Sequence, residues 1–147
     1  MRAPVLREIV CVEAPGGGRA HLVLFANERY LPLESAYPEQ VRAERGKGLR
    51  LGQVALLESD GSASAIIRLV AAAWRRFRAL ELDIIYIVVD ADDVALYTRL
   101  LFEKTPWGQA KWDFADYATV EVMRLNVSSA EARATDSFRR RFMRESQ

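Results

Sequence analysis

The sequence predicts an α/β (α+β) domain whose mixed, mostly antiparallel sheet has a central parallel strand pair and flanking helices. Three observations predict it. Two strand-like segments surround a glycine-rich turn, the centre of the chain alternates strand, helix and strand, and two more strand-like segments follow. Half of the 147 residues are apolar, which is enough to build one core at this length.

The first two segments, Leu6–Ala14 and Arg19–Asn27, predict a β-hairpin around Pro15–Gly18. No helix begins after these glycines and no Gly-Lys-Ser/Thr follows them, so a turn explains them better than a phosphate-binding loop. Cys11 and His21 lie on the two strands without partners of metal-ligand or nucleophile type nearby in sequence. We therefore expect packing roles for both, and no metal site.

A long connection, Glu28–Arg50, follows the hairpin. Pro38 can occupy the first turn of a short helix, Pro38–Arg45, that Gly46 and Gly48 stop. A connection of this length inside a compact domain is often functional, and the alternative is that it covers the sheet edge.

The centre of the chain predicts a strand at Gly52–Glu58, a turn at Ser59–Ser62, a helix at Ala63–Leu80 and a buried strand at Asp83–Asp90. A second helix is expected at Asp92–Phe102. The helical connection between the two strands is long enough for a parallel pair. The crossover should be right-handed, with a ligand crevice at the carboxyl ends of the strands.

Thr105–Phe114 and Ala118–Val127 predict a last antiparallel strand pair. Trp107, Trp112 and Tyr117 in this region either close the core or line an aromatic pocket. We expect one domain over residues 1–127, and a carboxyl-terminal amphipathic helix or tail over residues 128–147 that begins with a capping box at Ser128.

Composition narrows the function classes. With 21 basic and 20 acidic residues the net charge is +1, and the arginine clusters at Arg75–Arg78 and Arg139–Arg144 accompany no nucleic-acid-binding pattern, so no nucleic acid is expected. No apolar run approaches the length of a membrane span, and the start of the chain lacks a signal-peptide core. A single cysteine, Cys11, suits a reducing, cytoplasmic location.

Three places in the chain resemble a known family. They are the Pro-acidic segments around Leu31–Glu34 and Tyr37–Glu39 that lead into Leu49–Val54, the strand–turn–helix at Gln53–Ala73, and Tyr97–Phe102, which is similar to a Tyr-x-x-Leu-Gly-Phe ending of the last core helix. On these grounds the chain resembles a GNAT-superfamily acyltransferase, and within it the N-acyl amino acid synthase branch, which is related to autoinducer synthases.

The resemblance covers roughly Glu8–Val127 and includes departures. The superfamily's pyrophosphate loop, Gln/Arg-x-x-Gly-x-Gly/Ala, corresponds to Glu58–Ala63, where Glu58 and Asp60 add negative charges that would repel a pyrophosphate. Leu101 stands where the family has glycine, and Gln53 where a glutamate is common. The helices that usually precede the hairpin have no counterpart here, which leaves either a partner subunit to fill the gap or an incomplete acceptor pocket.

The resemblance implies transfer of an acyl group from acyl-CoA or an acyl-carrier protein to an amine such as an amino acid. It implies Tyr97 as the proton donor to the leaving thiolate, Glu58 as a candidate base, and a donor-binding set made of Leu56, Leu57, Gly61, Ser62 and Ala63. The alternative is a non-catalytic GNAT-like module that binds an acyl ligand or a protein partner. One form of this alternative is a homodimer through the face that the absent helices leave bare.

Overall fold

A six-stranded mixed sheet forms the centre of the molecule, in the order β1-β2-β3-β4-β6-β5. The computed structural model describes residues 6–26, 30–60, 63–107 and 120–143. The strands are β1 (Leu6–Glu13), β2 (Arg19–Ala26), β3 (Leu51–Ser59), β4 (Ile84–Asp90), β5 (Glu103–Lys104) and β6 (Val120–Asn126). Neighbouring strands are antiparallel except β3 and β4, which are parallel, so the predicted sheet is confirmed.

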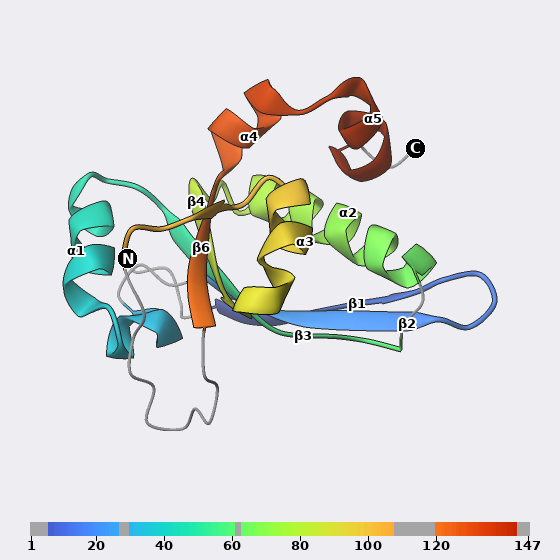
Figure 1. Ribbon diagram of the computed structural model, residues 1–147, viewed down its shortest axis with the longest axis horizontal. Helices are drawn as coiled ribbons and strands as arrows, with labels where there is room; N and C mark the ends of the chain where they lie inside the picture. Colours follow the sequence, from blue (N-terminus) through green and yellow to red (C-terminus); the bar gives the residue numbers. More distant parts are fainter. Residues whose placement is uncertain (1–5, 27–29, 61–62, 108–119, 144–147) are drawn as a thin grey trace.

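Helices cover both faces of this sheet (Figure 1). The α-helices are α1 (Pro38–Gly46), α2 (Ala63–Ala79), α3 (Val94–Arg99), α4 (Val127–Arg133) and α5 (Asp136–Phe138). The other helical turns are η1 (Pro32–Ser35), η2 (Ala91–Asp93) and η3 (Arg139–Met143), the last of which is a π-helix. In Figure 1, α2, α3 and the carboxyl-terminal helices lie together, and α1 stands apart from them at the left of the view.

Alternation along β4 separates two hydrophobic cores. Ile85 and Ile87 belong to the core under α2 and α3, whereas Ile84 and Tyr86 belong to a second core under η1 and α1. All four side chains are buried, as the continuous apolar run of this strand predicts. We call the two sides of the sheet the α2 face and the α1 face.

The amino-terminal hairpin forms as predicted, with β1 paired to β2 from Leu6 opposite Ala26 to Glu13 opposite Arg19. Gly16 and Gly17 in its turn have φ angles of 97° and 96°, a left-handed backbone that glycine adopts without strain. Cys11 is exposed on β1, which is an edge strand of the sheet.

The helix predicted to reach Phe102 is shorter than expected. α3 ends at Arg99, and Leu101 has a φ of 75° that no α-helix can continue through. The N–H groups of Leu100 and Phe102 both bond to the carbonyl of Tyr97, which ends the helix and turns the chain back to the sheet.

The last strand pair also differs from its predicted bounds. β5 contains only Glu103 and Lys104, and Thr105 extends the pairing through bonds from its N–H and hydroxyl to the Val122 carbonyl. Residues 108–119, with Trp112 and Tyr117, lie outside the described residues. The cap of α4 is Asn126 rather than Ser128, because its side chain accepts the Ser129 N–H at 3.0 Å.

The carboxyl-terminal segment packs on α2. Phe138 is buried, with its ring centroid 6.3 Å from that of Trp74 and 4.7 Å from that of Phe142. Arg78 of α2 donates to the Met143 carbonyl and pairs with Glu131. Within the ranges that the structure describes, no helix is long and apolar enough to cross a membrane.

Candidate active site

The two central parallel strands are held together at one end and separate at the other. At their amino ends Arg50 and Asp83 form a clamp, in which the Arg50 N–H donates to the Asp83 carboxylate at 2.7 Å and the Asp83 N–H donates to the Arg50 carbonyl at 2.8 Å. Pairing then runs over four positions and ends at Val54 opposite Ile87. Beyond it, β3 stays with β2 and β4 stays with β6. The sheet therefore opens between its central strands.

A β-bulge lies where β3 leaves β4. Along β2 and β3, His21 pairs with Glu58 and Val23 pairs with Ala55, so β3 has one more residue than β2 across this interval. The extra residue falls at Leu56 or Leu57. A bulge bends its strand and leaves one residue out of the ladder, so a backbone N–H group can turn toward the opening. Leu57 is half-buried and packs against the core of the α2 face.

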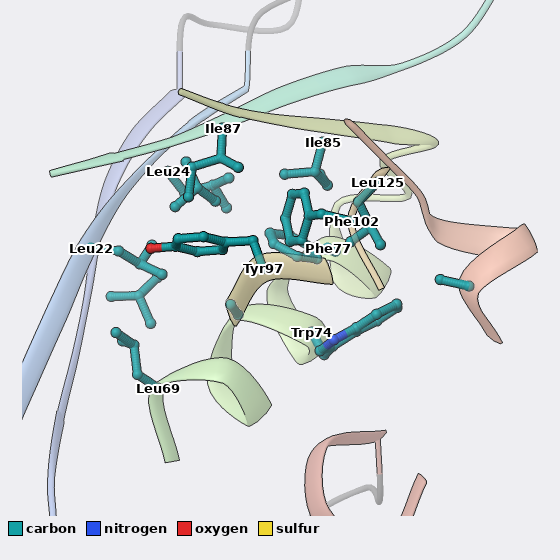
Figure 2. Packing of buried hydrophobic residues seen from close by; sticks show 14 of the residues in the cluster. Leu22, Leu24, Leu69, Trp74, Phe77, Ile85, Ile87, Tyr97, Phe102 and Leu125 are labelled. Carbon is teal, nitrogen blue, oxygen red and sulfur yellow. The ribbon is translucent and has the colours of Figure 1, made fainter. Parts of the chain in front are cut away.

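Tyr97 of α3 reaches this opening from the α2 face. Figure 2 shows its ring beside Leu24 and Ile87, with its hydroxyl toward Leu22. Leu24 is the cross-strand partner of Val54, so the ring sits at the level where the central strands part. Phe102 contacts the ring edge-on at 6.1 Å between centroids.

The Tyr97 hydroxyl is a buried polar group that no described residue hydrogen-bonds. Only 9% of the residue is exposed, and its hydroxyl bonds to nothing in the described part of the chain. Such a group costs about 1–3 kcal/mol of folding free energy, and native structures keep few of them. Burial, reinforced by the nearby Asp93 carboxylate, raises the pKa of Tyr97, so the phenol stays protonated at neutral pH.

The loop after β3 is held to the start of β2. The Arg19 N–H donates to the Asp60 carboxylate at 2.8 Å, and the Asp60 N–H donates to the Arg19 carbonyl at 3.1 Å. Gly61 and Ser62, predicted to bind a pyrophosphate, lie outside the described residues, and α2 begins at Ala63. The structure thus gives Asp60 a structural role at the head of this loop.

Glu58 is on the other face of the sheet from Tyr97. Its side chain is 70% exposed, with its carboxylate 3.6 Å from His21 Nε2 across the strand pair. The register places His21 on the same face as Val23, whereas Leu22 is on the Tyr97 side. Of the sequence-predicted site residues, the structure brings Leu57 and Tyr97 into one core and leaves Glu58 on the α1 face.

Gln53, at a position where a glutamate is common in the acyltransferases that the sequence resembles, is a structural residue. It is 5% exposed, and its Oε1 accepts the Leu33 N–H at 2.8 Å. The bond ties η1 to the central strand. Because its amide is neutral, Gln53 is buried without the desolvation penalty of a carboxylate.

Sequence reasoning missed a polar cluster on the α1 face, made of Glu44, Tyr86 and Arg124. The Glu44 carboxylate accepts from the Tyr86 hydroxyl at 3.0 Å and from Arg124 Nε and Nη2 at 2.5 and 3.2 Å. Burial alone would raise the pKa of Glu44, but bonds from Arg124 and Tyr86 and the charges of Arg124 and Lys47 outweigh it and lower that pKa. No sequence pattern joins these residues, because 80 positions separate Glu44 from Arg124.

A cleft of about 470 Å³ opens beside this cluster, between α1 and the β5–β6 edge. We call it the α1–β6 cleft. Its lining residues are Gln40, Ala43, Glu44, Lys47, Glu103, Lys104, Thr105, Pro106, Trp107, Arg124 and Asn126. Trp107 packs between Tyr37 and Tyr86, with ring centroids at 5.4 and 5.3 Å. The described residues contain no group of three or more His, Cys, Asp or Glu side chains arranged to hold a metal ion.

The strand order and the separation of the central pair agree with a GNAT-like fold. Two solved structures illustrate it. FeeM, an N-acyl amino acid synthase from uncultured soil microbes, superposes with a TM-score of 0.64 at 20% identity, over 80% of this chain and 64% of that chain. A mutant form of the spermidine/spermine N-acetyltransferase SpeG from Vibrio cholerae gives a TM-score of 0.50 at 17% identity, over 80% and 72% of the two chains.

This chain thus spans less than two thirds of the length of the synthase that it resembles. No family model and no curated protein sequence matches it. At these identities the likeness establishes the fold.

Proposed function

We propose that this protein is an N-acyltransferase that transfers an acyl group from a thioester donor to an amine. The observation that carries the proposal is the buried Tyr97 hydroxyl, without a hydrogen bond to any described residue, at the level where β3 and β4 separate. A polar group kept unpaired in an apolar core destabilises the fold, so a ligand partner is a reason for its presence. The fold that FeeM shares supports the same chemistry.

In the proposed reaction the amine nitrogen attacks the thioester carbonyl carbon, the C–N bond forms and the C–S bond breaks. Backbone N–H groups of the bulge at Leu56 and Leu57 stabilise the developing oxyanion. The Tyr97 hydroxyl gives its proton to the leaving thiolate. Glu58, directly or through water, takes the proton that the amine loses, from the opposite face of the sheet.

The donor in this proposal is acyl-CoA or an acyl-carrier protein. By the resemblance, backbone N–H groups of Gly61, Ser62 and Ala63 would hold a CoA pyrophosphate. Glu58 and Asp60 oppose that charge, whereas the pantetheine arm of a carrier protein asks less of this loop. The acceptor class is an amine such as an amino acid. A cytoplasmic location, where Cys11 would stay reduced, is part of the proposal.

Donor binding tests the proposal directly. The full chain is titrated with acetyl-CoA, a long-chain acyl-CoA and an acylated carrier protein, and the melting temperature is followed. An acyl donor that binds only the folded state, at a concentration of 100 times its Kd, should add about 2.7 kcal/mol to the free energy of unfolding. Stabilisation by none of the three would refute it. Tighter binding of acyl-CoA by Glu58→Gln would show that this carboxylate opposes the CoA pyrophosphate, since the variant removes a negative charge at the end of β3, next to the loop.

A non-catalytic GNAT-like module is the second candidate. The exposed Glu58 carboxylate beside the loop favours it, because a negative charge there weakens phosphate binding. Ile9, 67% exposed on edge strand β1, offers a contact for a second copy. This candidate predicts a concentration-dependent dimer by light scattering and no turnover with any thioester. A monomer at all concentrations, or product formation, would contradict it.

A further inference from the structure

The α1–β6 cleft has features of a binding site that is separate from the opened central strands. Its wall includes Arg124 and Asn126 of β6. These two residues pair with Tyr86 and Ile84 of β4, at the clamped end of the parallel pair. The opening begins only after Ile87, toward the other end. At about 470 Å³ the cleft is in the size range of small-molecule sites.

The Glu44, Glu103 and Asn126 acceptors in the cleft are already engaged, whereas the Gln40 side-chain carbonyl has no partner among the described residues. The Glu44 carboxylate accepts three hydrogen bonds from Tyr86 and Arg124, and Asn126 Oδ1 accepts the Ser129 N–H. At the rim, the Glu103 carboxylate pairs with Arg133 at 3.1 Å. A ligand that brings donors would therefore find few acceptors.

Donors in the cleft remain available. A guanidinium has five N–H groups, and Arg124 uses two of them on Glu44. Among described residues, neither the Asn126 side-chain amino group nor the Gln40 amide has a partner. The Lys47 amino group is 3.8 Å from the Glu44 carboxylate, which is a long ion pair, and the Lys47 side chain is 68% exposed. It can therefore turn toward a ligand. The cleft thus offers free hydrogen-bond donors to a ligand that accepts hydrogen bonds.

Charge specifies the ligand further. Lys47, Lys104 and Arg124 against Glu44 and Glu103 leave the lining with one positive charge in excess. Including the two ion-pair partners at the rim, Glu121 on Lys104 and Arg133 on Glu103, leaves the same excess. One surplus positive charge balances a monoanion better than a phosphate dianion.

Apolar groups provide the remaining wall. Trp107 contributes a ring that Tyr37 and Tyr86 hold in place, next to Pro106 and Ala43. We propose that the α1–β6 cleft binds a small monocarboxylate that carries an aromatic or other apolar group. Its carboxylate lies among Arg124, Asn126 and Lys47, and its apolar part lies on Trp107. This inference does not depend on acyl transfer.

The test uses three carboxylates, namely acetate, phenylacetate and indole-3-acetate, against their neutral amides, with inorganic phosphate as a second anion. Titration calorimetry on the full chain should show saturable binding of the aromatic carboxylates with one site per chain. The amides of phenylacetate and indole-3-acetate should each bind at least about tenfold more weakly than the corresponding acid. Inorganic phosphate should bind at least about tenfold more weakly than either aromatic carboxylate. Equal affinity for acid and amide, tighter binding of phosphate, or no saturable binding of any carboxylate would overturn the proposal.

Two variants localise the site. Lys47→Gln should weaken phenylacetate binding several-fold, because it removes the surplus charge from an exposed side chain without disturbing the fold. Arg42→Gln, an equal loss of charge at an exposed position of the same helix outside the cleft lining, should leave the affinity unchanged. Equal weakening by both variants would contradict a site in the cleft. Because no thioester is present, the result is independent of the acyltransferase proposal.

Discussion

At the scale of single residues, Tyr97 is where stability and proposed function conflict. Its ring contributes to the core of the α2 face, but its hydroxyl is buried without a hydrogen bond to any described residue. Phenylalanine would fill the same space without the desolvation penalty of the hydroxyl. Packing alone therefore does not account for a tyrosine here, and the proposed proton donation would.

Tyr97→Phe should have opposite effects on stability and on the proposed acyl-transfer activity. Removing the unpaired hydroxyl should raise the free energy of unfolding by about 1 kcal/mol, measured by urea denaturation. If Tyr97 is the proton donor, the acyl-transfer rate should fall about 100-fold or more, measured by thiol release. A variant that is less stable and equally active would mean that the hydroxyl is bound within the protein and plays no part in catalysis.

Glu44 makes a pH-dependent contribution to stability. Its pKa in the folded protein lies below the ordinary value of 4.5, so its ion pair stabilises the fold at pH values above 4.5. That stabilisation is lost as the pH falls through the lowered pKa. Glu44→Gln should therefore destabilise the protein by about 1–3 kcal/mol at pH 7 and by much less near pH 3, as followed by urea denaturation.

Glu39→Gln provides the matched control for this measurement, since it removes one carboxylate from an exposed position of the same helix. An equal pH dependence of the Glu39→Gln and Glu44→Gln differences would show that net charge, rather than the buried ion pair, is responsible.

At the scale of secondary-structure elements, two helices end through residues with left-handed backbone. After α2, Glu81 has a φ of 54°, while the Leu82 N–H bonds to the Phe77 carbonyl. After α3, Leu101 has a φ of 75°. Glycine adopts this geometry without strain, which fits the glycine that the acyltransferases resembled by this sequence have at the position of Leu101.

Glu81→Gly should raise the free energy of unfolding by about 0.5–1 kcal/mol. The side chain is exposed, so its removal loses little packing. Glu81→Ala is the control: it removes the same side chain but keeps the strain, and it should give no increase. Thermal unfolding of the three proteins measures the difference. Equal stabilisation by alanine and glycine would show that the charge at this position, and not the backbone, matters.

At the scale of the whole molecule, one end of the central strand pair is fastened and the other is open. The clamp of Arg50 with Asp83 keeps the amino ends of β3 and β4 together, and the bulge turns β3 away beyond Val54. Each strand keeps its other neighbour, so the sheet opens without leaving either strand unpaired on both edges.

Variants in the carboxyl-terminal segment, residues 128–143, test whether the folded domain extends beyond residue 127. Our sequence-based boundary between residues 127 and 128 stays a prediction, yet Phe138 packs on Trp74 of α2. Phe138→Ala should lower the free energy of unfolding by about 3 kcal/mol in a single cooperative transition. Phe142→Ala, at a half-buried position, should cost less. A separate early transition, or no loss from Phe138→Ala, would show that this segment folds apart from the domain.

The amino-acid sequence determined the local and periodic features of this protein. Alternating and continuous apolar runs predicted the hairpin, α2 and the parallel pair, and the bounds of those elements agree within one residue at each end. The residues of Tyr97–Phe102 identified the position of the proposed proton donor. Sequence reasoning extended α3 too far because the left-handed backbone at Leu101 is occupied by a residue that does not favour it.

Only the tertiary structure decided which distant residues meet. It joined Glu44, Tyr86 and Arg124, placed Glu58 on the opposite face from Tyr97, and left the Tyr97 hydroxyl without a partner among described residues. The physical reason is that a period of two or of 3.6 residues specifies which face a side chain takes within its own element. Strand order, the bulge register and the packing of α1 on the sheet specify its neighbours, and these depend on contacts across the whole chain.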